Sequence, residues 1–130
     1  MEQRYIAGDL VRYTSLCKGP IAEICEVRET SYLVRFMKGN FVRVTSQEIK
    51  PIPLTPAILE KNGWKDYFKG SIWKELATKR AYLYITKDQT TEDEYLVCCG
   101  RSKSNLASIK YVHQLQHLLF GLGINHEIEV

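Results

Sequence analysis

The three histidines of this chain are the side chains best suited to metal binding, and two of them have the spacing of one helix face. His113 and His117 are four residues apart, so a helix would place both imidazoles on the same side. Two imidazoles hold a metal only when the fold supplies further ligands. The zinc-protease pattern also needs a glutamate after the first histidine, where this chain has Gln114. We therefore predict no metal and no cofactor.

The same histidines also fit a contact surface. A helix over Ile109–Leu122 would place Phe120 close to them, on the side opposite its apolar face. Exposed imidazoles and a phenyl ring are typical of a protein interface. We predict an interface at His113, His117 and Phe120, and the alternative is burial of this face against a neighbouring hairpin.

Spacings typical of enzymes are missing from the sequence. It holds no Ser-His-Asp or His-Cys arrangement and no glycine-rich phosphate loop. Its cysteines, Cys17, Cys25, Cys98 and Cys99, form no Cys-x-x-Cys pair, which favours reduced structural thiols. We predict a protein that is not an enzyme. An enzyme whose groups converge only through the fold stays the less favoured alternative.

Two arginines indicate an anion or partner site in the first half of the chain. In the expected strands Tyr32–Met37 and Phe41–Thr45, a three-residue loop would place Arg35 directly opposite Arg43. Facing like charges repel, and a bound phosphate or partner carboxylate would remove that cost. The alternative is neutralisation by Glu23 or by an acidic residue of the second half.

The same alternation sorts the other side chains of these strands. We place Tyr32, Val34, Phe36, Val42 and Val44 inside. The residues predicted to face outward, and to form the binding site or pack under the second half, are Leu33, Arg35, Met37, Phe41 and Arg43.

A second candidate site mixes aromatic rings with basic residues. Single-stranded nucleic acid binds to such mixtures, because bases stack on rings while phosphates pair with cations. The candidates are Trp64, Lys65, Trp73, Lys74, Lys79 and Arg80. A half-buried strand with lysines reaching into solvent uses the same residue types, and this structural interpretation is the one we favour.

Composition limits the number of domains and the classes of partner that we expect. The chain has 130 residues, of which 45% are hydrophobic and 25% charged, as in one globular domain or two very small ones. The net charge of +3 is too mild to imply nucleic acid by itself. No apolar run could span a bilayer, and no signal-peptide core follows Met1. We expect a cytoplasmic protein without membrane contact.

The first half reads as five short strands. They are expected within Asp9–Tyr13, Ile21–Val27, Tyr32–Met37, Phe41–Thr45 and Ser46–Pro51. Five short strands bury two faces most simply by curling. The stretch from Gly8 to Pro51 resembles an SH3-like barrel of the KOW or Tudor type, through Gly8-Asp9-Leu10-Val11 and Gly19-Pro20-Ile21. That resemblance implies binding of RNA, DNA, peptides or proteins.

The second half reads as helix, hairpin, helix. Thr55, Pro56 and Gly63 punctuate a short first helix. Strands over 80–87 and 94–99 form the hairpin, 102–105 is a loop, and Asn105 or Ser108 caps the last helix. Residues 124–130 return as an edge strand.

The expected fold class is therefore α+β. An SH3-like barrel at 1–53 is followed at 54–130 by a module of a short helix, a β-hairpin and a C-terminal amphipathic helix.

Two stretches carry a resemblance to a known group of proteins. They are Pro51-Ile-Pro-Leu-Thr-Pro-Ala-Ile-Leu-Glu-Lys-Asn-Gly-Trp64 and Lys110-Tyr-Val-His-Gln-Leu-Gln-His-Leu-Leu-Phe-Gly-Leu-Gly123. Both resemble a family of small uncharacterised proteins of gut Bacteroidetes, their phages and mobile elements. The resemblance implies a small accessory protein and brings no catalytic residues.

These expectations lead to a non-enzymatic binding protein of a phage or mobile element. Its partner would be a protein, a nucleic acid or a nucleotide, and a homo-oligomer is also compatible with the sequence. The alternative is a counter-defence inhibitor that blocks a host nuclease or sequesters a nucleotide signal.

Overall fold

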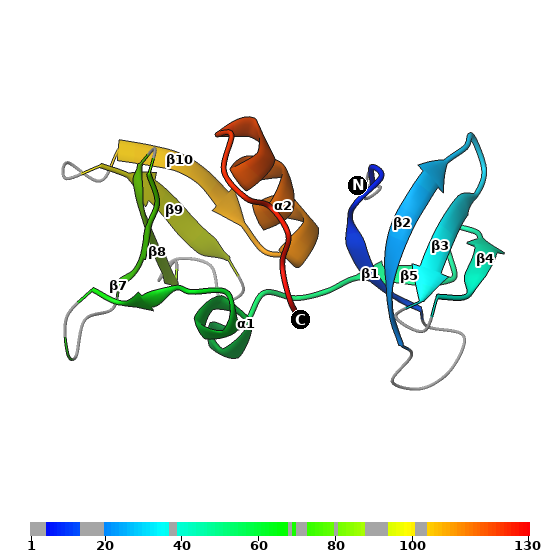
Figure 1. Cartoon of the computed structure of the whole chain (residues 1–130), viewed down its shortest axis with the longest axis horizontal. Helices are drawn as coiled ribbons and strands as arrows, with labels where there is room; N and C mark the ends of the chain where they lie inside the picture. Colours follow the sequence, from blue (N-terminus) through cyan, green and yellow to red (C-terminus); the bar gives the residue numbers. More distant parts are fainter. Residues whose placement is uncertain are drawn as a thin grey trace. The chain divides into compact units, whose positions relative to one another are not determined.

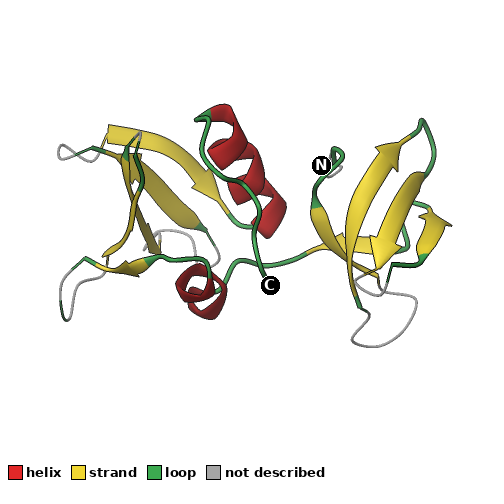
Figure 2. Ribbon diagram, in the orientation of Figure 1, coloured by secondary structure: helices red, strands yellow, loops and turns green. Residues whose placement is uncertain are grey.

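The computed structural model describes residues 5–13, 20–36, 39–67, 69, 73–79, 81–87, 94–100 and 104–130. The chain divides into two compact units. The first unit comprises Met1–Pro53 and Tyr111–His113, and the second comprises Leu54–Lys110 and Gln114–Val130. Each unit contains one five-stranded antiparallel sheet, so the described chain is mostly β rather than the expected α+β (Figure 2).

The sheet of the first unit has the strand order β4-β3-β2-β1-β5 (Figure 1). Its strands are β1 (Leu10–Tyr13), β2 (Ile21–Val27), β3 (Tyr32–Phe36), β4 (Phe41–Val44) and β5 (Ile49–Pro51). Among the described residues β4 and β5 end this order and do not pair, so the expected closed barrel is wrong. β4 has four residues and β5 has three, and in the described part of the unit no hydrogen-bond ladder joins these two end strands.

One face of this sheet holds the core of the first unit. Its buried members are Tyr5, Val11, Ala22, Ile24, Val34, Val44 and Ile49, and Tyr13, Tyr32 and Phe36 pack against them. The prediction of an inward face is confirmed for Val34 and Val44. Val42 is the exception, at 37% exposed. It lies on an edge strand, where the core covers it from one side only.

The pairing of β3 with β4 differs from the expected register. Arg35 lies opposite Phe41, and Leu33 lies opposite Arg43, so the predicted Arg35–Arg43 pair is wrong. The Phe36 N–H donates to the Asn40 carbonyl at 2.9 Å, so the strands separate one residue earlier than expected. Gly39, with φ of 90°, takes the left-handed position that ends such a loop, because glycine adopts it at less cost than asparagine.

The sheet of the second unit has the strand order β10-β9-β8-β7-β6. Its strands are β6 (Lys65–Asp66), β7 (Trp73–Ala77), β8 (Tyr82–Lys87), β9 (Tyr95–Cys99) and β10 (Ser104–Ile109). The predicted hairpin is confirmed as β8 and β9. The expectation of a single hairpin is wrong, because β7 pairs with β8 and β10 with β9.

Strand β10 takes the place of the end of the expected loop, at 104–105, and of the start of the last helix; residues 102–103 lie outside the described ranges. Asn105 and Ser108, the expected caps, pair with β9 instead. Helix α2 runs over Val112–Gly121, and the Gln114 side chain near its start accepts the Lys110 N–H at 2.7 Å. This bond ties the segment before the helix to its first turn, as the returning side chain of a capping box does.

Helix α1 (Pro56–Lys61) has the predicted ends. The Thr55 hydroxyl accepts the Ile58 N–H at 3.2 Å, and Gly63 has φ of 91°. The Asn62 amide donates to the Glu129 carbonyl and accepts the Glu129 N–H, both at 2.7 Å. These bonds attach the C-terminal segment to α1, and residues 124–130 do not form the expected edge strand.

Candidate functional site

Strand β4 leaves one edge of the first sheet open. Because the Phe36 N–H bonds to Asn40, the alternation of antiparallel pairs bonds Val42 and Val44 to β3. The backbone N–H and C=O groups of Phe41 and Arg43 then point away from β3. In the described part of the chain no strand pairs with this side of β4. The edge therefore offers backbone donors and acceptors to another strand.

Four predicted site residues lie together beside this edge. Opposite residues of a sheet point to the same face, so the observed register places them on the side away from the core. We call Leu33, Arg35, Phe41 and Arg43 the β4 surface. Phe41 is 59% exposed, more than any other large apolar side chain among the described residues of the first unit. Large exposed apolar side chains beside an open edge are typical of interaction sites.

The arginines of the β4 surface already have acidic partners. Arg35 lies 2.8 Å from a Glu23 carboxylate oxygen, and Arg43 lies 3.8 Å from one of Glu26. Arg43 also donates to the Ser31 hydroxyl at 3.1 Å. The alternative that Glu23 neutralises Arg35 is thus confirmed. No bound anion is needed to hold the two arginines on one face.

Glu26 belongs to a second ion pair. A hydrogen bond from Arg28 holds the pKa of Glu26 below its usual value, and Arg43 adds to this effect. A carboxylate that remains charged balances the arginines at neutral pH.

Several residues of the basic-aromatic segment are buried or paired with acidic residues. Trp64 is 2% exposed and Trp73 is half-buried. Lys74 lies 2.8 Å from Asp66 and 3.0 Å from Glu60. Lys65 and Lys79 are exposed, while Arg80 and Met37 lie outside the described residues. The structure therefore does not gather these candidates into one stacking platform.

The three residues of the predicted helix interface differ in how far they are exposed to solvent. His113 is 2% exposed and contacts the rings of Tyr5 and Tyr111, so its predicted outward position is wrong. His117 is half-buried. Phe120 is 64% exposed, and its ring meets the His126 ring edge to face, with ring centroids 5.1 Å apart.

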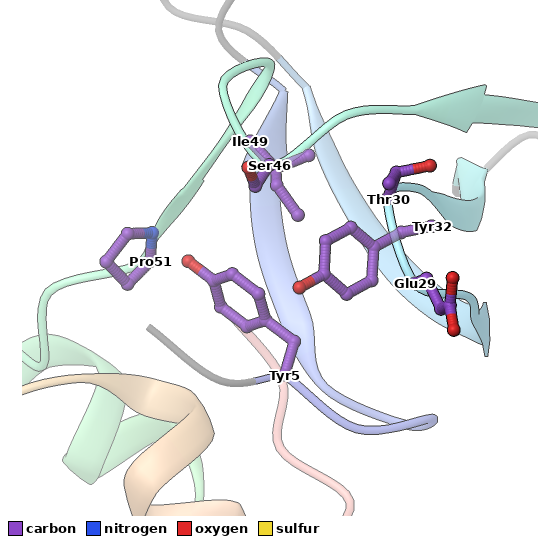
Figure 3. Close-up of a pocket in the computed structure, with 7 residues that line it drawn as sticks. All are labelled: Tyr5, Glu29, Thr30, Tyr32, Ser46, Ile49 and Pro51. Carbon is purple, nitrogen blue, oxygen red and sulfur yellow. The ribbon is translucent and has the colours of Figure 1, made fainter. Parts of the chain in front are cut away.

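The first unit also contains a pocket that the sequence did not predict (Figure 3). Its volume is about 320 Å³, and it is lined by Tyr5, Glu29, Thr30, Tyr32, Ser46, Ile49 and Pro51. These residues come from three separate stretches of the chain, at Tyr5, at 29–32 and at 46–51. A local pattern therefore could not reveal it, although Tyr32 was correctly predicted to face inward.

Comparisons of this chain with models of protein families, with curated proteins and with solved structures find no match. Within the ranges that the structure describes, no helix has the length and apolarity to cross a membrane. The same ranges hold no cluster of three His, Cys, Asp or Glu residues that could bind a metal.

Proposed function

We propose that this chain is a non-enzymatic binding protein, and that its partner is an extended segment of another protein added as a strand to β4. The open edge of β4, with Phe41 exposed beside it, is the observation that carries the proposal. Backbone hydrogen bonds would supply affinity, and an apolar partner side chain over Phe41 would supply specificity.

The charges favour a protein over a nucleic acid. Arg35 and Arg43 have carboxylate partners, and Lys74 has two. Phosphate binding would need to displace these carboxylates, whereas an uncharged strand would not. A partner segment of apolar and neutral polar residues therefore complements the β4 surface best.

The size of the edge favours a peptide segment over a second copy of this chain. β4 has four residues, and two of them direct backbone groups outward. A strand of this length spans only about 14 Å. Two such edges would bury far less than the roughly 1,200 Å² typical of stable interfaces.

The test uses a random peptide library displayed on phage and selected against the intact protein. Selected peptides are then measured on two variants, Arg43→Pro and Arg43→Ala. Proline removes the outward N–H, while alanine keeps it and removes the same side chain. We expect Arg43→Pro to weaken binding by about tenfold or more, because each lost backbone hydrogen bond contributes roughly 0.5–1.5 kcal/mol and the ring also blocks close approach.

Two results would contradict the proposal. Peptides that bind Arg43→Pro as well as the original protein would place the binding site elsewhere. A stable dimer in sedimentation, lost in Arg43→Pro and kept in Arg43→Ala, would make a second copy the occupant of the edge.

A further inference from the structure

The pocket of the first unit is built around two tyrosines. The rings of Tyr5 and Tyr32 meet edge to face, with centroids 5.7 Å apart and planes at 85°. Figure 3 shows both rings in the middle of the pocket, with Pro51 on one side and Glu29 and Thr30 on the other. The volume of about 320 Å³ is at the lower end of the range for small-ligand sites.

The described residues that line the pocket carry a negative charge. Glu29 is the charged residue among the described lining residues, and the polar remainder consists of hydroxyl groups. Aromatic faces attract cations through their quadrupole, and hydroxyl oxygens accept hydrogen bonds from ammonium groups. Among the described lining residues, an anionic ligand would find a carboxylate and no cation.

The surroundings of Tyr5 point in the same direction. The Asp9 carboxyl is buried, at 1% exposed, and accepts the Ile6 N–H at 2.8 Å. Burial, followed by the influence of Tyr32, Asp9 and Tyr111, raises the pKa of Tyr5 to about 12. Burial opposes a charge of either sign, so it is the contribution of the Asp9 carboxylate that favours a positive charge nearby.

We infer that this pocket binds an organic cation of the alkylammonium class, held by the rings of Tyr5 and Tyr32 and by the carboxylate of Glu29. A lysine side chain and a quaternary amine share this chemistry. The site is separate from the β4 surface and shares none of its residues, so either proposal can fail without the other.

The experiment titrates the intact protein with three small probes and follows the tyrosine ring signals by NMR. The probes are tetramethylammonium, n-butylammonium and tert-butanol, a neutral molecule of similar shape to the first. We expect the signals of Tyr5 and Tyr32 to shift with saturation for a cation and not for tert-butanol. Tighter binding of n-butylammonium would identify a lysine-like ligand, and tighter binding of tetramethylammonium a quaternary one.

Variants locate the binding site. Glu29→Gln removes the charge from an exposed side chain and should weaken cation binding by about two- to fivefold. Tyr32→Leu removes an aromatic face and should weaken it by about tenfold. Glu127→Gln, the matched control, makes the same charge change at an exposed residue of the second unit and should have no effect.

The proposal is overturned if neither cation shifts the two tyrosines with saturation, or if tert-butanol binds equally well. It is also overturned if Glu29→Gln and Glu127→Gln bind the cations as tightly as the unmodified protein. Because Tyr32 packs on the core, an unfolded Tyr32→Leu would leave the Glu29→Gln comparison as the deciding result.

Discussion

At the scale of single residues, Lys74 shows how an apparent binding residue can serve the fold. Its ammonium group contacts both Asp66 and Glu60, and its side chain is only 17% exposed. These contacts, first of all the hydrogen bond to Asp66, raise the pKa of Lys74 above its usual value of 10.5. The lysine is therefore more strongly protonated in the folded state than in the unfolded chain.

This difference predicts a pH dependence at the alkaline side. A raised folded-state pKa means that the stabilisation is fully present below pH 10.5 and is lost as the pH rises through the folded value. We expect Lys74→Met to be less stable than the original protein at neutral pH, with a difference that shrinks above pH 10.5. Urea unfolding of both proteins from pH 7 to 12 checks this. A difference that stays constant would contradict the role of the charge.

The sequence predicted which residues form the β4 surface, but it left open which acidic residues pair with its arginines. Alternation alone places Leu33, Arg35, Phe41 and Arg43 on one face, and this survives a shift of register by two residues. The acidic partners of the arginines depend on how β2 pairs with β3, and no local sequence pattern predicts that pairing. The sequence was equally ambiguous at Trp64, because an aromatic ring among lysines fits both a nucleic-acid stacking platform and a buried core position.

At the scale of elements, local signals predicted those structures whose causes are local. Thr55, Pro56 and Gly63 define α1 because capping involves neighbours along the chain. Strand β10 was missed because Ser104–Ile109 holds only one β-branched residue, and its strand state depends on pairing with β9. The open edges of the first sheet likewise depend on long-range pairing. The resemblance to a Bacteroidetes family stays a prediction.

Two glycines provide a test of the local backbone. Gly39 has φ of 90° and Gly121 lies in α2, and a Cβ atom at either position would meet nothing within 4 Å. The effect of alanine therefore comes from the backbone alone. We expect Gly39→Ala to destabilise the folded protein by about 1 kcal/mol, because a positive φ is a strained conformation for alanine. Gly121→Ala should stabilise by up to about 1 kcal/mol, because alanine favours helix.

Thermal or urea unfolding measures both glycine changes. Equal effects of the same sign would contradict the assignment of Gly39 to the left-handed end of the β3–β4 loop. That loop sets the register of β4, so the test also bears on the placement of Phe41 and Arg43 at the open edge.

At the scale of the whole molecule, both proposed sites belong to the first unit. Its core is formed by residues between Tyr5 and Ile49, and the β4 surface and the tyrosine pocket lie within residues 5–51. The second unit has its own buried side chains, among them Leu59, Trp64, Leu83, Ile85 and Leu115. Units with buried side chains of their own can differ in stability.

This division predicts that core changes act within one unit. Ile24 and Leu83 are both 0% exposed, the first in β2 and the second in β8. Ile24→Ala and Leu83→Ala should each cost roughly 2–5 kcal/mol, through lost burial and the cavity left behind. Residue-resolved amide exchange should show faster opening of β1–β5 in the first variant and of β7–β10 in the second. If either change loosens both sheets equally, the units unfold together. If they open separately, Leu83→Ala should keep peptide and cation binding while Ile24→Ala loses both, which would assign the binding function to the first unit.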